Sequence, residues 1–214
     1  MQNSQPNNDE LLAFRDKWQI TVNLLAKYLE VPSALVMHVA ESEIEVFVAS
    51  NAKENPYKAK QKLNLGKGHY YESLLKNGKI LNIPNALKDE KWKDNPAIDL
   101  NLISFLGLPI FCSDKNAFGI ICVLDHKERH FDTEQIDLLK QFKYLIEADI
   151  NICAKSKKDA DKNITILSEN AIKAKQINKQ LIEERNIFTK GNVVVFKWKN
   201  GGAWPVEYVS QNVA

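Results

Sequence analysis

Hydrophobic residues in the first 125 positions recur with two different periods. From Asp9 to Leu29 apolar side chains recur every three or four residues, which predicts an amphipathic helix. Shorter apolar or alternating runs then predict five strands and one short helix. The strands are expected at about 34–39, 44–50, 79–83, 103–112 and 117–125, and the short helix at about 69–77. This order predicts an α+β fold in which helices pack on one face of an antiparallel sheet.

The longest pattern is helical and runs from Asp132 to about Arg185 without Pro or Gly. Its first part is apolar enough to pack on the sheet, and its second part carries a seven-residue repeat. One seam of the repeat is apolar: Leu139, Ile146, Cys153, Ala160, Leu167, Ala174, Leu181 and Phe188. The partner seam is partly polar, since Lys157 and Asn178 lie in it. The repeat predicts a homodimer through residues 132–188, and a long helix lying on its own domain is the alternative.

These patterns divide the chain into four parts. Residues 1–8 are polar and predict a disordered leader, and residues 9–150 predict a globular domain. Residues 151–190 predict an extended helix. Residues 191–214 contain two β-rich runs on either side of Asn200-Gly201-Gly202, which predict a hairpin at the start of a further, incomplete domain.

Composition excludes several classes of protein. The formal net charge is only +2, so no basic surface for nucleic acid is expected. The N-terminus lacks the features of a signal peptide, and no apolar run is long enough to span a membrane. The three cysteines, Cys112, Cys122 and Cys153, show neither disulfide nor zinc spacing. We therefore expect a cytoplasmic protein that binds neither nucleic acid nor membrane.

The segments of residues 9–150 resemble the GAF family of sensor domains. The resemblance is carried by VPSALVMHVAESEIEVFVASN, GHYYESLL, LNIPNALKDEKWKDNPAID, ISFLGLPIF, FGIICVLD and FDTEQIDLL, in this order and spacing. The tail NVVVFKWKNGGAWPVEYVSQNV looks like the first two strands of a PAS domain. A GAF, helix and PAS succession resembles the input half of sensor histidine kinases and diguanylate cyclases. No such output signature occurs here, so the chain itself is not expected to be an enzyme.

The resemblance implies a small-molecule site between the sheet and the elements that cover it, at about 69–75 and 85–101. Trp92 is an aromatic residue in a very polar loop, which suits the enclosure of a small ligand or, alternatively, anchors the loop to the core. The hydroxyl of Ser104 either points into this pocket or is buried and hydrogen-bonded. The predicted ligand-binding residues are Tyr70, Tyr71, Glu72, Trp92, Asp94, Asn95 and Ser104.

More specific activities of GAF domains find little support in the residues. His69 has no neighbouring cysteine, so covalent attachment of a bilin is not expected. The cysteines lie on expected strands or the long helix, which argues against a thiol-based methionine sulfoxide reductase using Cys112 or Cys122. The residues after Asp125 match the cyclic-nucleotide motif only loosely. The histidines form no close ligand set, and no metal, catalytic residue or cofactor is expected.

Two interpretations of the chain remain. In the first, a small molecule binds the pocket and alters the long helix, which signals to a downstream PAS or output domain. In the second, the domain is a ligand-free dimerisation scaffold whose pocket is filled by large side chains. Four residues are large enough to fill it: Phe47, Phe105, Phe118 and Trp92.

Overall fold

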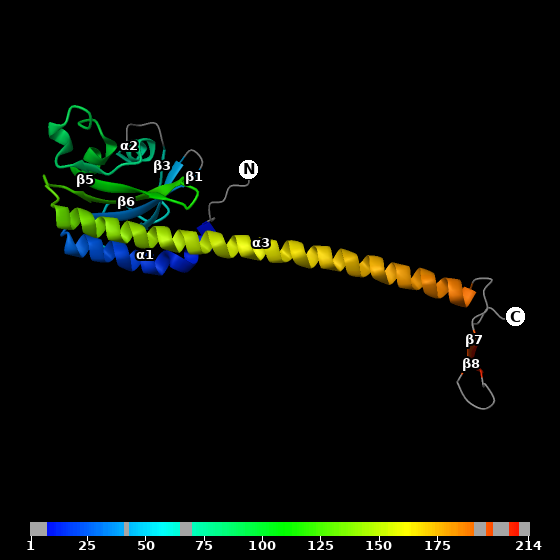
Figure 1. Ribbon diagram of the computed structural model, residues 1–214. Coiled ribbons are helices and arrows are strands. Elements are labelled where there is room, and N and C mark those ends of the chain that lie inside the picture. Colours follow the sequence, from blue (N-terminus) through cyan, green and yellow to red (C-terminus); the bar gives the residue numbers. More distant parts are fainter. Residues whose placement is uncertain (1–7, 41–42, 65–69, 191–195, 199–205, 210–214) are drawn as a thin grey trace. The chain divides into compact units, whose positions relative to one another are not determined.

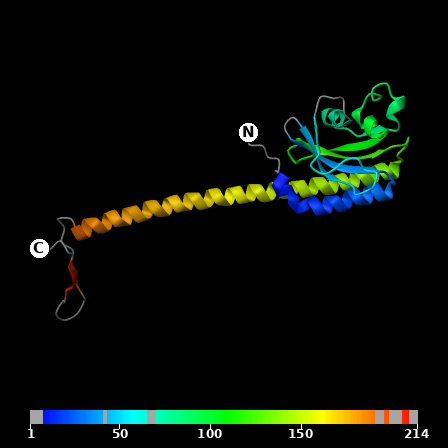
Figure 2. The same cartoon turned by 180° about the vertical axis from the view of Figure 1, so that it is seen from behind.

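The computed structural model describes residues 8–40, 43–64, 70–190, 196–198 and 206–209 of the chain. The chain forms two compact units, Met1–Lys157 and Lys158–Ala214. The first unit contains a six-stranded sheet with helices on both of its faces. The second contains the distal part of a long helix and a two-stranded sheet (Figures 1 and 2).

The main sheet is antiparallel throughout and has the strand order β3-β2-β1-β6-β5-β4. Its strands are β1 (Ser33–Ala40), β2 (Glu43–Ala49), β3 (Lys62–Asn64), β4 (Leu81–Ile83), β5 (Ser104–Phe111) and β6 (Ala117–Asp125). The pairing shifts register between Val36 and Met37 in β1 and between Ile110 and Phe111 in β5. The central strands β1, β6 and β5 are the most apolar, as expected for strands covered on both faces.

Three α-helices complete the first unit: α1 (Asn8–Tyr28), α2 (Tyr70–Asn77) and the start of α3 (Thr133–Lys190). The beginning of α3 is fixed by a capping box. Asp132 Oδ1 accepts from the backbone N–H of Gln135 at 2.8 Å, and Gln135 Oε1 accepts from that of Asp132 at 3.1 Å. The end of α2 is fixed by Gly78, which adopts φ +64 and donates its N–H to the carbonyl of Leu74.

The helices cover the sheet unequally. Helices α1 and α3 lie side by side across one face, whereas α2 lies over the other (Figures 1 and 2). The predicted α+β fold with an antiparallel sheet and a long C-terminal helix is confirmed. The prediction placed the helices on one face, which holds for α1 and the start of α3, whereas α2 covers the other face. We call the face covered by α1 and α3 the helix face, and the face covered by α2 the α2 face. Each has its own buried apolar layer, so both sides of every central strand are covered.

The helix face is organised around Trp18, which is fully buried. The indole packs edge-on against Phe47 and Phe118, with ring centroids 5.3 Å and 6.1 Å away. Its Nε1–H donates to Asp149 Oδ2 at 2.9 Å, and Lys17 Nζ donates to Asp149 Oδ1 at 2.7 Å. A buried carboxylate of α3 thus holds two consecutive residues of α1. The two helices are joined by this contact as well as by apolar packing.

The end of α1 is tied to the loop after β6 by Arg129. Its guanidinium donates to Asp125 Oδ2 at 2.6 Å, to the Leu29 carbonyl at 2.9 Å and to the Glu30 carbonyl at 3.0 Å. Planar guanidinium donors suit such a fork of acceptors. Arg129 therefore satisfies two carbonyl groups that the end of a helix leaves without partners.

The observed elements differ from the predicted ones in a few places. The short strand β3 pairs with β2 at the sheet edge and was not predicted. Helix α2 begins at Tyr70, and His69, where its start was predicted, lies outside the described residues. The predicted leader lies outside them too, apart from Asn8, which already belongs to α1. The register shift in β5 lies next to Pro109 and to the pair formed by Ile110 and Gly119.

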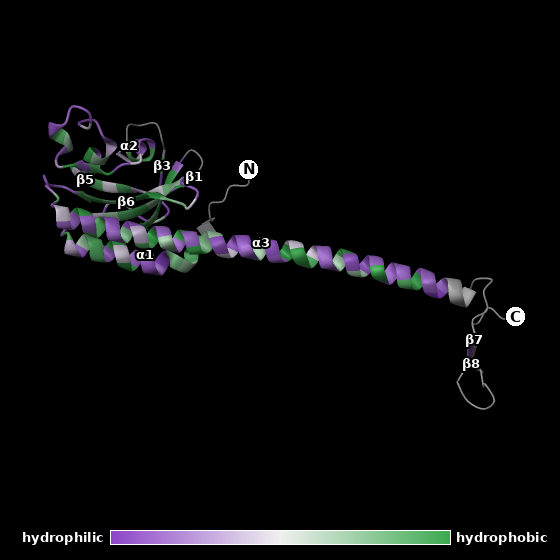
Figure 3. Ribbon diagram, in the orientation of Figure 1, coloured by the Kyte–Doolittle hydropathy of each residue, from purple (hydrophilic) through white to green (hydrophobic). Residues whose placement is uncertain are grey.

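The second unit begins within α3. Every described side chain from Lys158 to Asn186 is exposed, and hydrophobic positions recur between hydrophilic ones along this part of the helix (Figure 3). The strands β7 (Phe196–Trp198) and β8 (Val206–Val209) pair antiparallel, as predicted for a terminal hairpin. None of the helices within the described ranges is long and apolar enough to cross a membrane.

Candidate functional site

A small cavity lies on the α2 face, between the sheet and the elements that cover it. Its walls come from β1, β5 and β6 below and from α2 and the segments at 57–63 and 95–97 around it. Its volume is about 20 Å³. The residues that line it are Leu35, Met37, Tyr57, Leu63, Tyr70, Tyr71, Asn95, Ala97, Phe105, Ile120, Cys122 and Leu124. All except Leu63 are buried.

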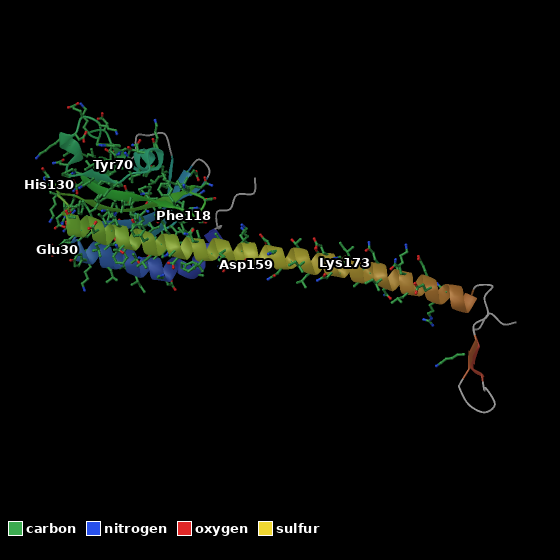
Figure 4. All side chains as sticks on the ribbon, viewed as in Figure 1. Glu30, Tyr70, Phe118, His130, Asp159 and Lys173 are labelled. Carbon is green, nitrogen blue, oxygen red and sulfur yellow. The ribbon has the colours of Figure 1, made fainter. Side chains whose placement is uncertain are left out.

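Tyr70, the first residue of α2, is held between two other aromatic rings. Its ring centroid lies 4.5 Å from that of Phe105 on β5 and 5.2 Å from that of Trp92. Figure 4 shows Tyr70 on the α2 face and Phe118 on the side of the long helices. The Tyr70 hydroxyl is buried and has no hydrogen-bond partner among the described residues. A buried polar atom without a partner is unusual and calls for a water molecule or a ligand.

Tyr57 is positioned by a hydrogen-bond network around Asn55. The Asn55 side chain accepts from the Ser33 hydroxyl at 2.8 Å and from the backbone N–H of Tyr57 at 3.1 Å. Its amide nitrogen also donates to the carbonyl of Ser50 at 2.9 Å. The loop after β2 is thereby fixed to the start of β1. This fixation directs the Tyr57 side chain into the cavity wall.

The segment 84–103 covers the cavity and is shaped by two short 3-10 helices, η1 (Ala86–Lys88) and η2 (Pro96–Leu100). The side chains of Asn85 and Asn95 cap them by accepting from Leu87 N and Ala97 N. Because Asn95 is buried and its side chain caps η2, that side chain is fixed at the cavity wall.

An exposed cluster attaches this covering segment to the loop after β6. Glu128 Oε2 accepts from Lys88 Nζ at 2.6 Å and from Asn85 Nδ2 at 3.0 Å. These hydrogen bonds lower the pKa of Glu128 to about 2, and the bond from Lys88 makes the largest contribution. The carboxylate is therefore ionised at any physiological pH. Exposure to solvent keeps the contribution of such a pair to stability small.

The polar groups that the described residues bring to the cavity are neutral at physiological pH. Burial raises the pKa of Tyr57, Tyr70 and Tyr71 above the ordinary tyrosine value, with smaller contributions from neighbouring groups. Burial also raises the pKa of the Cys122 thiol. These groups can donate or accept hydrogen bonds, but they offer no charge to a ligand.

The structure brings together three of the seven predicted ligand-binding residues. Tyr70, Tyr71 and Asn95 line the cavity. Trp92 does not line it but packs behind Tyr70, with Lys91 Nζ 4.5 Å from the ring centroid of Trp92. This placement matches the alternative in which Trp92 anchors the loop.

The other three predicted residues lie away from the cavity. Glu72 is half-buried in the first turn of α2, and Asp94 is exposed. Ser104 pairs with Asp125 across β5 and β6, next to the Phe105–Leu124 pair that faces the cavity. Neighbouring residues of a strand point to opposite faces, so Ser104 belongs to the helix face. Its hydroxyl is buried there without a hydrogen-bond partner among the described residues, contrary to the expectation of a bonded hydroxyl.

Sequence reasoning missed most of the cavity wall. Tyr57 follows Asn55-Pro56 in a polar stretch, and an aromatic residue in such a stretch is the signal that singled out Trp92. The strand residues of the wall, such as Met37 and Cys122, carry no comparable signal, because apolar residues occur on both faces of these strands.

Thiol or metal chemistry finds no support at this site. Cys112 lies in the apolar layer of the helix face and Cys122 in that of the α2 face, so the sheet separates the two thiols. Burial, with smaller contributions from Asp114 and Glu147, raises the pKa of Cys112 to about 11. Among the described residues, no group of three or more His, Cys, Asp or Glu side chains could hold a metal ion.

A buried histidine on the helix face makes stability depend on pH. His38 stacks on Phe118 with ring centroids 4.5 Å apart, and neither of its ring nitrogens has a hydrogen-bond partner among the described residues. Burial lowers the pKa of His38. Between the folded and unfolded pKa values the unfolded chain binds more protons, so stability rises with pH. The contribution is complete above about pH 6.5 and declines below it.

We therefore expect the free energy of unfolding to fall between pH 7.5 and pH 5.5, with a slope from this residue of at most about 1.4 kcal/mol per pH unit. Urea titrations at several pH values measure it. The substitution His38→Leu should flatten the profile, because it removes the buried imidazole. Equal slopes in the wild type and His38→Leu would contradict the assignment.

Comparisons with known proteins agree with this architecture. The model of the GAF domain matches residues 15–150. A search of curated proteins finds no match. The GAF domain of PixJ from Thermosynechococcus elongatus, in its blue-light absorbing form, is 18% identical with a TM-score of 0.57, and the match covers 75% of this chain and 96% of that one.

Two further solved structures show the same fold. A methyl-accepting chemotaxis protein, residues 122 to 287, is 15% identical with a TM-score of 0.57, and the match covers 70% of this chain and 98% of that one. The free methionine-R-sulfoxide reductase from Neisseria meningitidis is 13% identical with a TM-score of 0.55, covering 67% and 81%. Such low identities establish the fold alone. Since the family model matches more than half of the chain, the chain belongs to the GAF domain family.

Proposed function

We propose that this chain is the sensory input module of a signal-transduction protein. A small molecule binds in the cavity of the α2 face, and α3 transmits its presence to a downstream PAS or output domain. Membership of the GAF family supports a sensory role. So do the structural neighbours, which include a light-absorbing PixJ domain, a phycocyanobilin-bound phytochrome domain and a chemotaxis protein. Three free cysteines suit a reducing compartment, and a cytoplasmic location is part of the proposal.

One observation carries the proposal: the cavity and α3 share the same strands. In β6, Cys122 and Leu124 face the cavity, whereas Ile121 and Val123 belong to the helix-face layer that contains Leu139 of α3. A ligand that displaces a cavity wall therefore displaces strands on which α3 rests. The ligand changes the signal only if it binds two arrangements of α3 with different affinities.

The dimer through α3 is part of the same proposal. Leu139 and Ile146, the first positions of the apolar seam, are buried in the core of their own domain. Later seam positions are exposed, including Leu167 at 67% and Leu181 at 58%. We therefore place the dimer contact in the part of the predicted 132–188 interface that follows Lys157. Apolar positions at heptad spacing stabilise a helix pair when a second copy covers them.

The small cavity favours a second candidate function, that of a ligand-free dimerisation scaffold. About 20 Å³ is far below the several hundred Å³ of ordinary ligand pockets, because Phe105 and the tyrosines fill the space. Only part of the predicted filling is correct, since Phe47 and Phe118 lie on the helix face against Trp18. In this alternative α3 still pairs, but no ligand controls it.

Native mass spectrometry of the purified chain tests both candidates. A dimer that carries a small, removable adduct is the expected result, and a bare dimer would favour the scaffold.

We expect Leu167→Glu to give monomers, since the seam would place two carboxylates against each other. Ile172→Glu, at an equally apolar position outside the seam with 58% exposure, should leave the dimer intact. A monomeric wild-type chain, or equal effects of both substitutions, would contradict pairing through this seam.

A further inference from the structure

Among the residues that the structure describes, those that line the cavity carry no formal charge. Their hydrogen-bonding groups are three phenols, the amide of Asn95 and the thiol of Cys122, and the remaining side chains are hydrocarbons apart from the thioether of Met37. A charged ligand would lose its hydration on entering such a site without gaining an opposite charge. The lining therefore favours a neutral occupant.

The N-terminus of α2 does not change this conclusion. Tyr70 is both the first residue of the helix and part of the cavity wall, and helix N-termini attract anions. Glu72, however, already places a carboxylate in the first turn of α2. That carboxylate already interacts with the positive end of the helix, so an anionic ligand gains less from it.

The Tyr70 hydroxyl needs a hydrogen-bond acceptor. It is buried without a partner among the described residues, and its ring is held between Phe105 and Trp92, so it cannot turn freely toward solvent. Burial raises the pKa of Tyr70, so the hydroxyl keeps its proton at neutral pH and can donate it in a hydrogen bond. An acceptor atom in the cavity would complete its hydrogen bonding.

We infer that the ligand is a small neutral molecule with an apolar body and an oxygen that accepts a hydrogen bond from Tyr70, such as a short-chain alcohol, ketone or amide. The inference rests on the proposed function, because it takes this cavity as the ligand site. The volume of about 20 Å³ accommodates one water-sized group. A ligand of several heavy atoms therefore enters when the covering elements, α2 and the segment 84–103, move outward.

Met37 provides a direct test, because it lines the cavity and its methyl signal in a methionine-labelled NMR spectrum reports binding there. The probes are isobutyramide and isobutyrate, which have nearly the same shape and differ in charge at pH 7. We expect isobutyramide to shift the Met37 signal saturably and isobutyrate to leave it unchanged at equal concentration.

The role of the hydroxyl is tested by Tyr70→Phe, which removes the donor and keeps the ring. We expect the Kd for isobutyramide to rise about two- to tenfold, which corresponds to the net free energy of one hydrogen bond. Tyr144→Phe, at an exposed tyrosine of α3, is the matched control and should not change Kd. An unchanged Kd in Tyr70→Phe would overturn the assigned hydrogen bond.

The outcomes separate the ligand class from the proposed function. If isobutyrate shifts Met37 with an equal or lower Kd, the neutral class is wrong while the cavity remains a binding site. If neither probe shifts Met37 at any accessible concentration, both the class and the cavity as a ligand site are wrong. The comparison of the two probes uses the wild-type chain, so it does not depend on whether a variant folds.

Discussion

Replacing Gly119 with alanine is expected to destabilise the first unit severely. A Cβ atom at this position would lie 1.8 Å from the carbonyl oxygen of Met37 and 2.9 Å from its carbonyl carbon. Both atoms belong to the backbone of β1, the central neighbour of β6, and cannot turn aside as a side chain can. We expect a loss of at least about 2 kcal/mol in the free energy of unfolding, measured by urea denaturation. The pairing of β1 with β6 would have to open to admit the methyl group.

Gly107→Ala is the matched control on the neighbouring strand. Its Cβ would meet the ring of Phe105 at 2.6 Å and Leu74 Cδ1 at 2.9 Å, both of them ends of side chains. These groups can shift, so we expect a smaller loss, of about 1 kcal/mol. If Gly119→Ala were no more destabilising than Gly107→Ala, the close approach of β6 to β1 would not be the constraint that we infer.

The elements of the fold could be predicted from the sequence where a hydrophobic pattern was long or where capping or turn residues marked its ends. The start of α3 was predicted to within one residue, because the polar residues that form its capping box precede a long helical repeat. The strand β3 has three residues, Lys62–Asn64, and so few positions show no periodicity. Its existence depends on pairing with β2, which is a tertiary contact that local sequence does not encode.

The site was harder to predict, because both faces of the central strands are apolar. Ser104 was assigned to the pocket, but the one-residue alternation of β5 gives Phe105 to the cavity and Ser104 to the helix face. Where both sides of a strand are buried, polarity does not say which side faces the ligand. Tyr70 and Asn95, which line the cavity, could be named from the sequence because each lies at the start of an element that the resemblance predicts to cover the sheet.

Replacing Asp149 is the second change for which a large effect is expected. Its carboxylate is almost fully buried and accepts from Trp18 Nε1 at 2.9 Å and from Lys17 Nζ at 2.7 Å. In Asp149→Ala the buried indole N–H loses its acceptor, which should cost about 2–3 kcal/mol of unfolding free energy. Lys17 adds little to this loss, because its side chain is 54% exposed and can return to water. Asp149→Asn keeps an oxygen acceptor for Trp18 and should cost about 1 kcal/mol.

A double-mutant cycle with Trp18→Phe separates the hydrogen bond from the packing of the indole. If the indole N–H is what makes Asp149→Ala costly, the same substitution should cost markedly less in the Trp18→Phe background, and the coupling free energy should be about 1 kcal/mol or more. Additive losses would show instead that Asp149 contributes to stability independently of the Trp18 indole. The distinction bears on the proposed transmission to α3, because Trp18 contacts the strand residues Phe47 and Phe118 as well as Asp149 of α3. If Trp18 and Asp149 are coupled, a displacement of the sheet can also reach α3 through α1.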